Sequence, residues 1–257
     1  MLEVTWVEGA ALVVAALFAG CVDAIAGGGG LLSLPALLAV GLPPHLALGT
    51  NKGQSVFGSG AALLRYSRAG LVHGGRARLA FPLGLLGSSL GAWLVFWIRP
   101  EVLRPLVLVL LGAAAAVVLF RPRVVPLVAD PSRTRQTVAA GLALIIATYD
   151  GFFGPGTGSF LIVALVSVLG LPLARASAEA KVVNFASNLA AVALFAQRGA
   201  VLWRLALPMA AAQWVGGYVG AHWTVAGGDR VVRRVLLCVV AALMLKLGWD
   251  LWQHGGA

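Results

Sequence analysis

Long apolar blocks dominate the sequence, and their length sets what the chain can fold into. They cover residues 10–40, 44–64, 79–98, 102–120, 136–170, 177–197, 202–222 and 235–252. One helix needs about 20 apolar residues to cross the hydrocarbon core of a bilayer. The composition agrees, because 60% of the residues are hydrophobic and only 11% are charged. The blocks are continuous rather than alternating, so we expect an all-α, polytopic transmembrane helix bundle.

Positive charge gathers between the apolar blocks. The formal net charge is +10, and arginine clusters lie at residues 65–78 and 121–135, whereas the first residues carry Glu3 and Glu8. Positively charged loops are retained in the cytoplasm. The clusters therefore predict that both loops are cytoplasmic and that the N-terminus lies outside. This distribution accounts for the basic charge without a nucleic-acid partner.

The two halves of the chain resemble each other. Asp23 aligns with Asp150 at an offset of 127 residues, and after a short insertion Lys52 aligns with Lys181 at an offset of 129. Such self-similarity indicates a duplicated unit. We expect a first transmembrane repeat at 1–122, a cytoplasmic linker at 123–136 and a second transmembrane repeat at 137–257. If the blocks 10–40 and 136–170 each enter the membrane and return, the repeats are inverted, which is the arrangement we expect.

Glycine-rich segments interrupt the two longest blocks. They read "GGGGLLS" at 27–33 and "GPGTGS" at 154–159. Irregular backbone at membrane depth is tolerated where it lines a cavity or is buried in protein. Helices that restart at Leu31 and near Ser159 would direct backbone N–H groups toward such a cavity, and helix N-termini bind anions. Tight helix packing is the alternative explanation for these glycines.

Ionisable residues also recur at equivalent positions inside apolar surroundings. They are Asp23 and Lys52 in the first half and Asp150 and Lys181 in the second. An ionisable group at the centre of a spanning helix costs about 3 kcal/mol on insertion scales, so four equivalent occurrences favour function over interfacial charges. In the absence of substrate, we expect each aspartate to pair with a lysine of the other half, because a buried unpaired charge is costly.

The residue pattern predicts a site for a small oxyanion between the halves. Lysine, amide and hydroxyl groups at helical spacing share a face, and cations with neutral donors bind oxyanions. The predicted substrate-binding residues are Lys52, Lys181, Gly28, Gly29, Gly30, Ser33, Asn51, Ser55, Gly156, Thr157, Gly158, Ser159, Asn184 and Asn188. Asp23, Asp150 and Glu179 are predicted to compensate charge or to carry a coupling ion.

Motifs of enzymes and metal sites are missing from the sequence. The G-x-G-x-G at 154–158 follows no βαβ pattern, and HExxH does not occur. The four histidines are scattered, and both cysteines lie in apolar blocks. We expect no enzymatic activity, no catalytic residues, no metal and no cofactor.

The segment "FAGCVDAIAGGGGLLSLPALLAVGLPPHLALGTNK", residues 18–52, resembles the signature of the TauE/SafE sulfite exporter family, also called the toluene sulfonate uptake permease family. The segment from Asp150 to Lys181 resembles the family's degenerate second half. The resemblance implies a transporter for sulfite, sulfonates or related organosulfur anions in the bacterial inner membrane.

Direction and coupling stay open at this point. We expect alternating access around a site near the bilayer midplane, with protons or sodium as candidate coupling ions, lipid as the surroundings and a homodimer as a candidate assembly. A passive anion channel and a non-transporting membrane sensor subunit are the alternatives.

Overall fold

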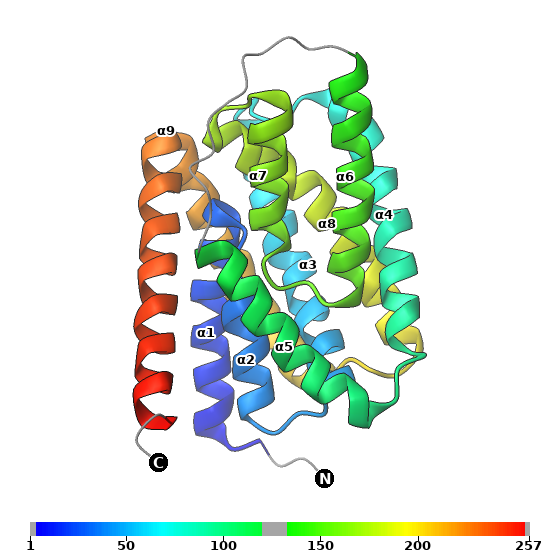
Figure 1. Cartoon of the computed structure of the whole chain (residues 1–257), viewed down its shortest axis with the longest axis vertical. Coiled ribbons are helices and arrows are strands. Elements are labelled where there is room, and N and C mark those ends of the chain that lie inside the picture. Colours follow the sequence, from blue (N-terminus) through cyan, green and yellow to red (C-terminus); the bar gives the residue numbers. More distant parts are fainter. Residues whose placement is uncertain (1–3, 120–132, 255–257) are drawn as a thin grey trace.

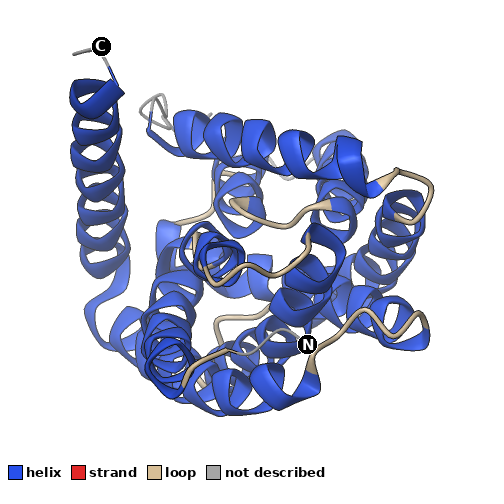
Figure 2. Cartoon of the chain, turned by 90° about the horizontal axis from the view of Figure 1, so that it is seen from below, coloured by secondary structure: helices blue, strands red, loops and turns tan. Residues whose placement is uncertain are grey.

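The computed structural model describes residues 4–119 and 133–254, and within these ranges the chain is helical and contains no strand (Figure 2). The predicted all-α class is therefore confirmed for the described residues. The helices are α1 (Trp6–Ala26), α2 (Gly30–Ala39), α3 (Pro44–Arg68), α4 (Gly74–Val95), α5 (Pro100–Leu119), α6 (Arg133–Phe152), α7 (Thr157–Leu169), α8 (Leu173–Gln197) and α9 (Trp203–His254). Most of the predicted linker, residues 123–132, lies outside the described residues, and its last four residues already belong to α6.

Both long blocks break where the glycines predict. α1 ends at Gly27, whose left-handed φ of 74° suits glycine because it carries no Cβ. In the second break Gly154 and Gly156 have φ values of 102° and 85°. The following helices begin slightly earlier than expected, at Gly30 rather than Leu31 and at Thr157 rather than near Ser159.

The central helices α3 and α8 pack against each other. Each has 25 residues and begins directly after a proline, Pro43 or Pro172. Among the described residues, three other helices are long and apolar enough to span a membrane, namely α1, α4 and residues 100–117 of α5. α3 and α8 are less apolar because their buried faces carry polar and charged side chains. Their position inside the bundle, rather than their hydropathy, accounts for their burial.

Helices from the two parts of the chain interlock. α1 packs along α9, and α4 packs along α6. In Figure 1, α1 and α2 occupy the lower part of the molecule, whereas α6 and α7 occupy the upper part. Glycines allow the close approach, since an added Cβ would clash with a facing backbone. The equivalent contacts are Gly87 with Leu144, Gly91 with Thr148, Gly216 with Leu17 and Gly220 with Cys21.

The blocks 202–222 and 235–252 form two helices, as the sequence predicts, and these meet within α9 at a kink where Gly228 has non-helical φ and ψ. After this residue α9 runs down the edge of the molecule (Figure 1). One expectation about helix ends was wrong. The arginine cluster 65–78 is mostly helical, because α3 and α4 extend past the apolar blocks and leave only residues 69–73 between them.

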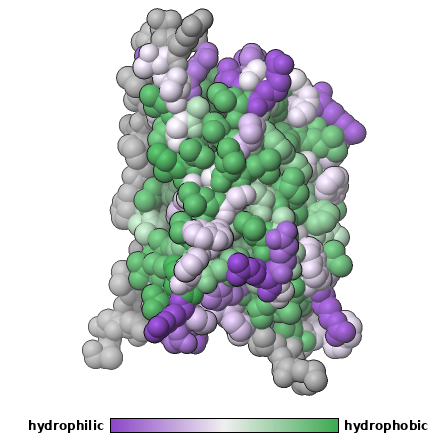
Figure 3. All heavy atoms as spheres, turned by 90° about the vertical axis from the view of Figure 1, so that its right-hand side faces the viewer, coloured by the Kyte–Doolittle hydropathy of each residue, from purple (hydrophilic) through white to green (hydrophobic). Residues whose placement is uncertain are grey.

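The outer surface suits lipid. Figure 3 shows apolar residues over the middle of one face, with hydrophilic residues gathered mainly toward the two ends. Several tryptophans are exposed, among them Trp93, Trp97 and Trp223. Exposed large apolar side chains around a bundle that buries lysine and aspartate are the reverse of the pattern in a soluble protein.

Candidate functional site

Two buried ion pairs lie where the helix breaks meet the central helices. Lys52 on α3 donates to Asp150 on α6 at 2.9 Å, and both side chains are 2% exposed. Lys181 on α8 donates to Asp23 on α1 at 2.7 Å, with Lys181 fully buried and Asp23 14% exposed. Each lysine thus pairs with the aspartate of the other half, as the sequence predicts. The four charges cancel, which limits the cost of burying them.

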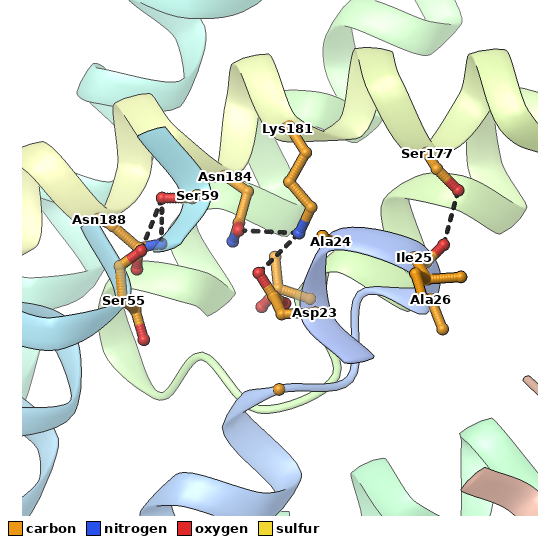
Figure 4. Close-up of polar contacts among 12 residues, drawn as sticks. Asp23, Ala24, Ile25, Ala26, Ser55, Ser59, Ser177, Lys181, Asn184 and Asn188 are labelled. Carbon is orange, nitrogen blue, oxygen red and sulfur yellow. Dashed lines mark hydrogen bonds and ion pairs between the residues drawn. The ribbon is translucent and has the colours of Figure 1, made fainter. Parts of the chain in front are cut away.

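Asparagine side chains connect the two ion pairs. Lys52 Nζ donates to Asn188 Oδ1 at 3.1 Å, and Lys181 Nζ lies 3.4 Å from Asn184 Oδ1. Asn184 Nδ2 in turn lies 3.4 Å from Asp150 Oδ2, so one amide contacts both pairs. Figure 4 shows Lys181 directed between Asp23 and Asn184. The helical spacing of Lys181, Asn184 and Asn188 places all three in this network.

A cavity of about 20 Å³ lies between these groups. That volume accommodates roughly one water molecule, which is less than a sulfur oxyanion requires. The site is therefore closed to such an anion in this conformation. Its lining residues are Asp23, Gly27, Gly30, Asn51, Lys52, Ser55, Asp150, Gly154, Gly158, Asn184 and Asn188.

The two helix breaks touch each other beside the ion pairs. The Ser159 backbone N–H donates to the Gly27 carbonyl at 3.1 Å. A Cβ on Gly158 would approach Gly27 Cα to 2.5 Å, and a Cβ on Gly27 would clash with the backbone of Gly158. Glycine at both positions is thus required for direct backbone contact.

Hydroxyl groups satisfy the last carbonyls of α1, which have no partner within the helix. Tyr66 on α3 donates to Ala24 at 2.9 Å, Ser177 on α8 donates to Ile25 at 2.8 Å, and Ser159 on α7 donates to Ala26 at 2.6 Å. Sequence reasoning missed Tyr66 and Ser177. The spacing of Ser177, four residues before Lys181 on the same helix face, was the signal that could have found it.

The second break is held in the same way. Tyr149 donates to the Pro155 carbonyl at 2.8 Å, and Thr157 donates to the Gly154 carbonyl at 2.6 Å. In the first half, Ser33 donates to Asn51 Oδ1 at 2.6 Å. A hydroxyl has a single proton to donate, so the hydroxyls of Ser33, Thr157 and Ser159 are engaged within the protein here. Their predicted donation to an anion stays a prediction for another conformation.

Some of the other residues predicted to bind substrate line the cavity between the ion pairs, and others lie away from it. Gly30, Asn51, Ser55 and Gly158 line it, whereas Gly28, Gly29 and Gly156 do not. Glu179 also lies apart, because its carboxylate pairs with Arg76 of α4 rather than with either lysine. The sequence pattern gave no sign of this partner, since Arg76 was assigned to a loop that sets topology. Within the described residues, no three His, Cys, Asp or Glu side chains are grouped as metal ligands.

A family of known proteins matches this chain over most of its length. The sequence profile described as "Sulfite exporter TauE/SafE" covers residues 12–247. The chain belongs to the TauE/SafE sulfite exporter family. The signature at residues 18–52 therefore identified the family correctly.

Curated relatives with the same extent are named as membrane transporters. The "Probable membrane transporter protein ORF9" of Sinorhizobium sp is 39% identical over 239 residues, covering 92% of this chain and 90% of the relative. The "Probable membrane transporter protein YfcA" of Escherichia coli (strain K12) is 36% identical over 244 residues, covering 93% and 88%. No solved structure matches the chain. This TauE/SafE member is thus a multi-pass membrane transporter.

Proposed function

We propose that this TauE/SafE chain is a secondary transporter of small sulfur-containing oxyanions, namely sulfite, sulfonates or related organosulfur anions. It acts by ion-coupled alternating access in the bacterial inner membrane. The observation that carries the proposal is the pair of buried lysines, Lys52 and Lys181, each neutralised by an aspartate from the opposite half of the chain.

An oxyanion that binds the two lysines must replace the carboxylates that neutralise them. In the closed conformation the carboxylates of Asp23 and Asp150 form ion pairs with the ammonium groups of the two lysines. An entering anion competes with these carboxylates for the two ammonium groups, and the amides of Asn184 and Asn188 can turn their N–H groups toward its oxygens. The displaced carboxylates then carry uncompensated charge. Protons or sodium ions taken up by them would couple transport to an ion gradient.

Inverted repeats provide the movement. The hairpins α1–α2 and α6–α7 occupy opposite ends of the molecule in Figure 1, and the glycine contacts of α4 with α6 recur between α9 and α1 at the repeat offset. This correspondence supports two equivalent bundles that rock around the site. The ion pairs and the contact of Gly27 with Gly158 join the two bundles. When the site opens toward one side of the membrane, the bundles separate on that side.

Counterflow of labelled sulfite and of a taurine-like sulfonate in proteoliposomes tests the proposal. Wild type is compared with Lys52→Met and Lys181→Met, each checked for folding by size-exclusion chromatography. We expect both variants to lose transport of the anion that wild type exchanges. Undiminished transport in both would refute the site, and no transport of either anion by wild type would refute the substrate class.

A second measurement separates a carrier from an anion channel. A coupled carrier accumulates labelled anion against its own gradient when a proton or sodium gradient is applied, whereas a channel does not. Failure to accumulate under either gradient, with counterflow intact, would refute coupling alone.

A further inference from the structure

A second, much larger cavity lies on the α6 side of the ion pairs. Its volume is about 520 Å³, and α4, α6, α7 and α8 form its walls. Most of the lining is apolar, including Leu79, Ala140, Ala143 and Leu165. A cavity of this size accepts a small organic molecule, unlike the cavity of about 20 Å³ between the lysines.

One charged pair interrupts the apolar lining. The guanidinium of Arg76 forms a two-pronged contact with the carboxylate of Glu179, with Nε donating to Oε2 at 2.6 Å and Nη2 donating to Oε1. Glu179 is 6% exposed, and Arg76 is 32% exposed. The equivalent residue in the first half is Thr50, whose hydroxyl accepts from the Leu202 N–H. The acidic group is therefore peculiar to this side of the protein.

The large cavity and the ion-pair site share three helices. On α6 the lining passes from Ala143 to Asp150, which are seven residues and about 10 Å apart at the rise of an α-helix. On α8 it passes from Val183 to the adjacent Asn184. Ala147, between these two positions on α6, belongs to the same buried apolar cluster as Leu161 and Val183, which line the large cavity. The cavity and the ion-pair site are thus joined by shared helices, with a buried apolar side chain between them on α6.

We propose that this cavity is the vestibule through which the transported anion reaches the lysines, and that Arg76 is the group that receives it. The inference rests on the proposed function. A sulfonate offers the guanidinium a face of two oxygens, like the Glu179 carboxylate that holds it in this conformation. Glu179 is therefore the competitor that the anion displaces, and the apolar walls contact the organic part of a sulfonate.

Topology gives the vestibule a side. Its lining includes residues from the first turns of α4 and α6, which begin at the basic segment 65–78 and at Arg133 and Arg135, and the charge distribution assigns these to the cytoplasm. The vestibule accordingly faces the cytoplasm, and the structure represents a conformation with its inner cavity formed and its central site closed.

Cysteine labelling tests the vestibule without requiring transport. Ala140→Cys is introduced into a background with Cys21→Ala and Cys238→Ala. The reaction rates of a sulfonatoethyl and a trimethylammonioethyl methanethiosulfonate are then compared, because the first reagent is itself a small sulfonate. We expect Arg76→Gln to lower the ratio of anionic to cationic rates about tenfold and Glu179→Gln to raise it.

Arg78→Gln is the matched control. Arg78 lies two residues from Arg76 on the same helix but lines a different pocket, so its removal changes the net charge equally. We expect it to leave the ratio within about twofold. Equal effects of the two substitutions would overturn the role of Arg76, and no labelling of Ala140→Cys by either reagent would overturn the vestibule.

Arg76→Lys serves if Arg76→Gln does not fold. It retains the charge but loses the two-pronged geometry. We therefore expect the same subsaturating concentration of unlabelled sulfonate to protect Ala140→Cys less than in the protein with Arg76; equal protection would contradict the receiving role. The labelling result and the counterflow result fail separately. Preferential labelling by the anionic reagent in a protein that transports no sulfur anion would support the vestibule and refute the substrate class. Intact counterflow of a sulfur anion without preferential labelling would support the substrate class and refute the vestibule.

Discussion

Lys52 and Asp150 are 98 residues apart in the sequence, yet their side chains form an ion pair of 2.9 Å in which both are almost completely buried. The pair joins α3 to the end of α6, where the chain breaks before α7. An anion that binds Lys52 must therefore weaken a contact that holds two helices together. In the mechanism that we propose, substrate binding and opening of the bundle are linked through the same ammonium group.

The first prediction concerns the stability of this pair. We expect Lys52→Met to lower the free energy of unfolding by about 3–5 kcal/mol, because it leaves Asp150 buried without its cation. The double variant Lys52→Met with Asp150→Asn should recover most of that loss, since no buried charge remains. Thermal unfolding in detergent measures both. A single variant as stable as wild type would show that Asp150 has another partner.

Transport by the same double variant separates stability from function. If Lys52 binds the anion, the restored stability does not restore counterflow. Recovery of counterflow together with stability would assign Lys52 a structural role only.

The second prediction compares the two aspartates. Asp23 is 14% exposed and Asp150 is 2% exposed, so water solvates Asp23 better when its partner is changed. We therefore expect Lys181→Met to destabilise the protein less than Lys52→Met. For coupling, at least one of Asp23→Asn and Asp150→Asn should lose accumulation driven by a pH gradient while keeping counterflow. Full pH-driven accumulation in both variants would exclude the aspartates as proton carriers.

The charged residues and the helix breaks could be predicted from the sequence, because the free-energy cost of placing them in an apolar block depends only on that block. A lysine or four glycines within an apolar block are unfavourable wherever the block packs, so they stand out against the apolar residues on either side. The partners of these residues are not local. Tyr66 reaches the end of α1 only because α3 packs there, and Arg76 meets Glu179 only because α4 lies on α8.

Helix ends were predicted less well for a related reason. Hydropathy detects the part of a helix that meets lipid, whereas α3 and α4 continue beyond it through polar turns. The same limit applies to α9, where charged residues near 230 suggested a loop but the helix is interrupted only at Gly228.

The third prediction concerns the hydroxyls that hold the end of α1. Tyr66→Phe leaves the Ala24 carbonyl buried without this donor, which we expect to cost about 1–3 kcal/mol. Tyr218→Phe on α9 is the control, because it removes the same hydroxyl from a side chain that is 37% exposed rather than buried against α1. Chemical unfolding in detergent compares the two, and equal losses would contradict a specific role for the contact of Tyr66 with α1.

The last prediction concerns the contact between the two breaks. Gly158 is helical, so Gly158→Ala gains helix propensity, but its Cβ would lie 2.5 Å from Gly27 Cα. We expect the clash to dominate and to cost about 1–3 kcal/mol. Gly141→Ala on α6 is the matched control, because it has the same propensity gain and no atom within 4 Å of the added Cβ. It should stabilise the protein by about 0.5–1 kcal/mol.

Unfolding midpoints and counterflow of the two alanine variants decide whether this contact matters for transport. If the breaks must approach each other to close the site, Gly158→Ala loses counterflow and Gly141→Ala keeps it. A Gly158→Ala protein that is as stable and as active as Gly141→Ala would mean that the breaks stay apart during transport, and the glycines would then serve helix packing alone.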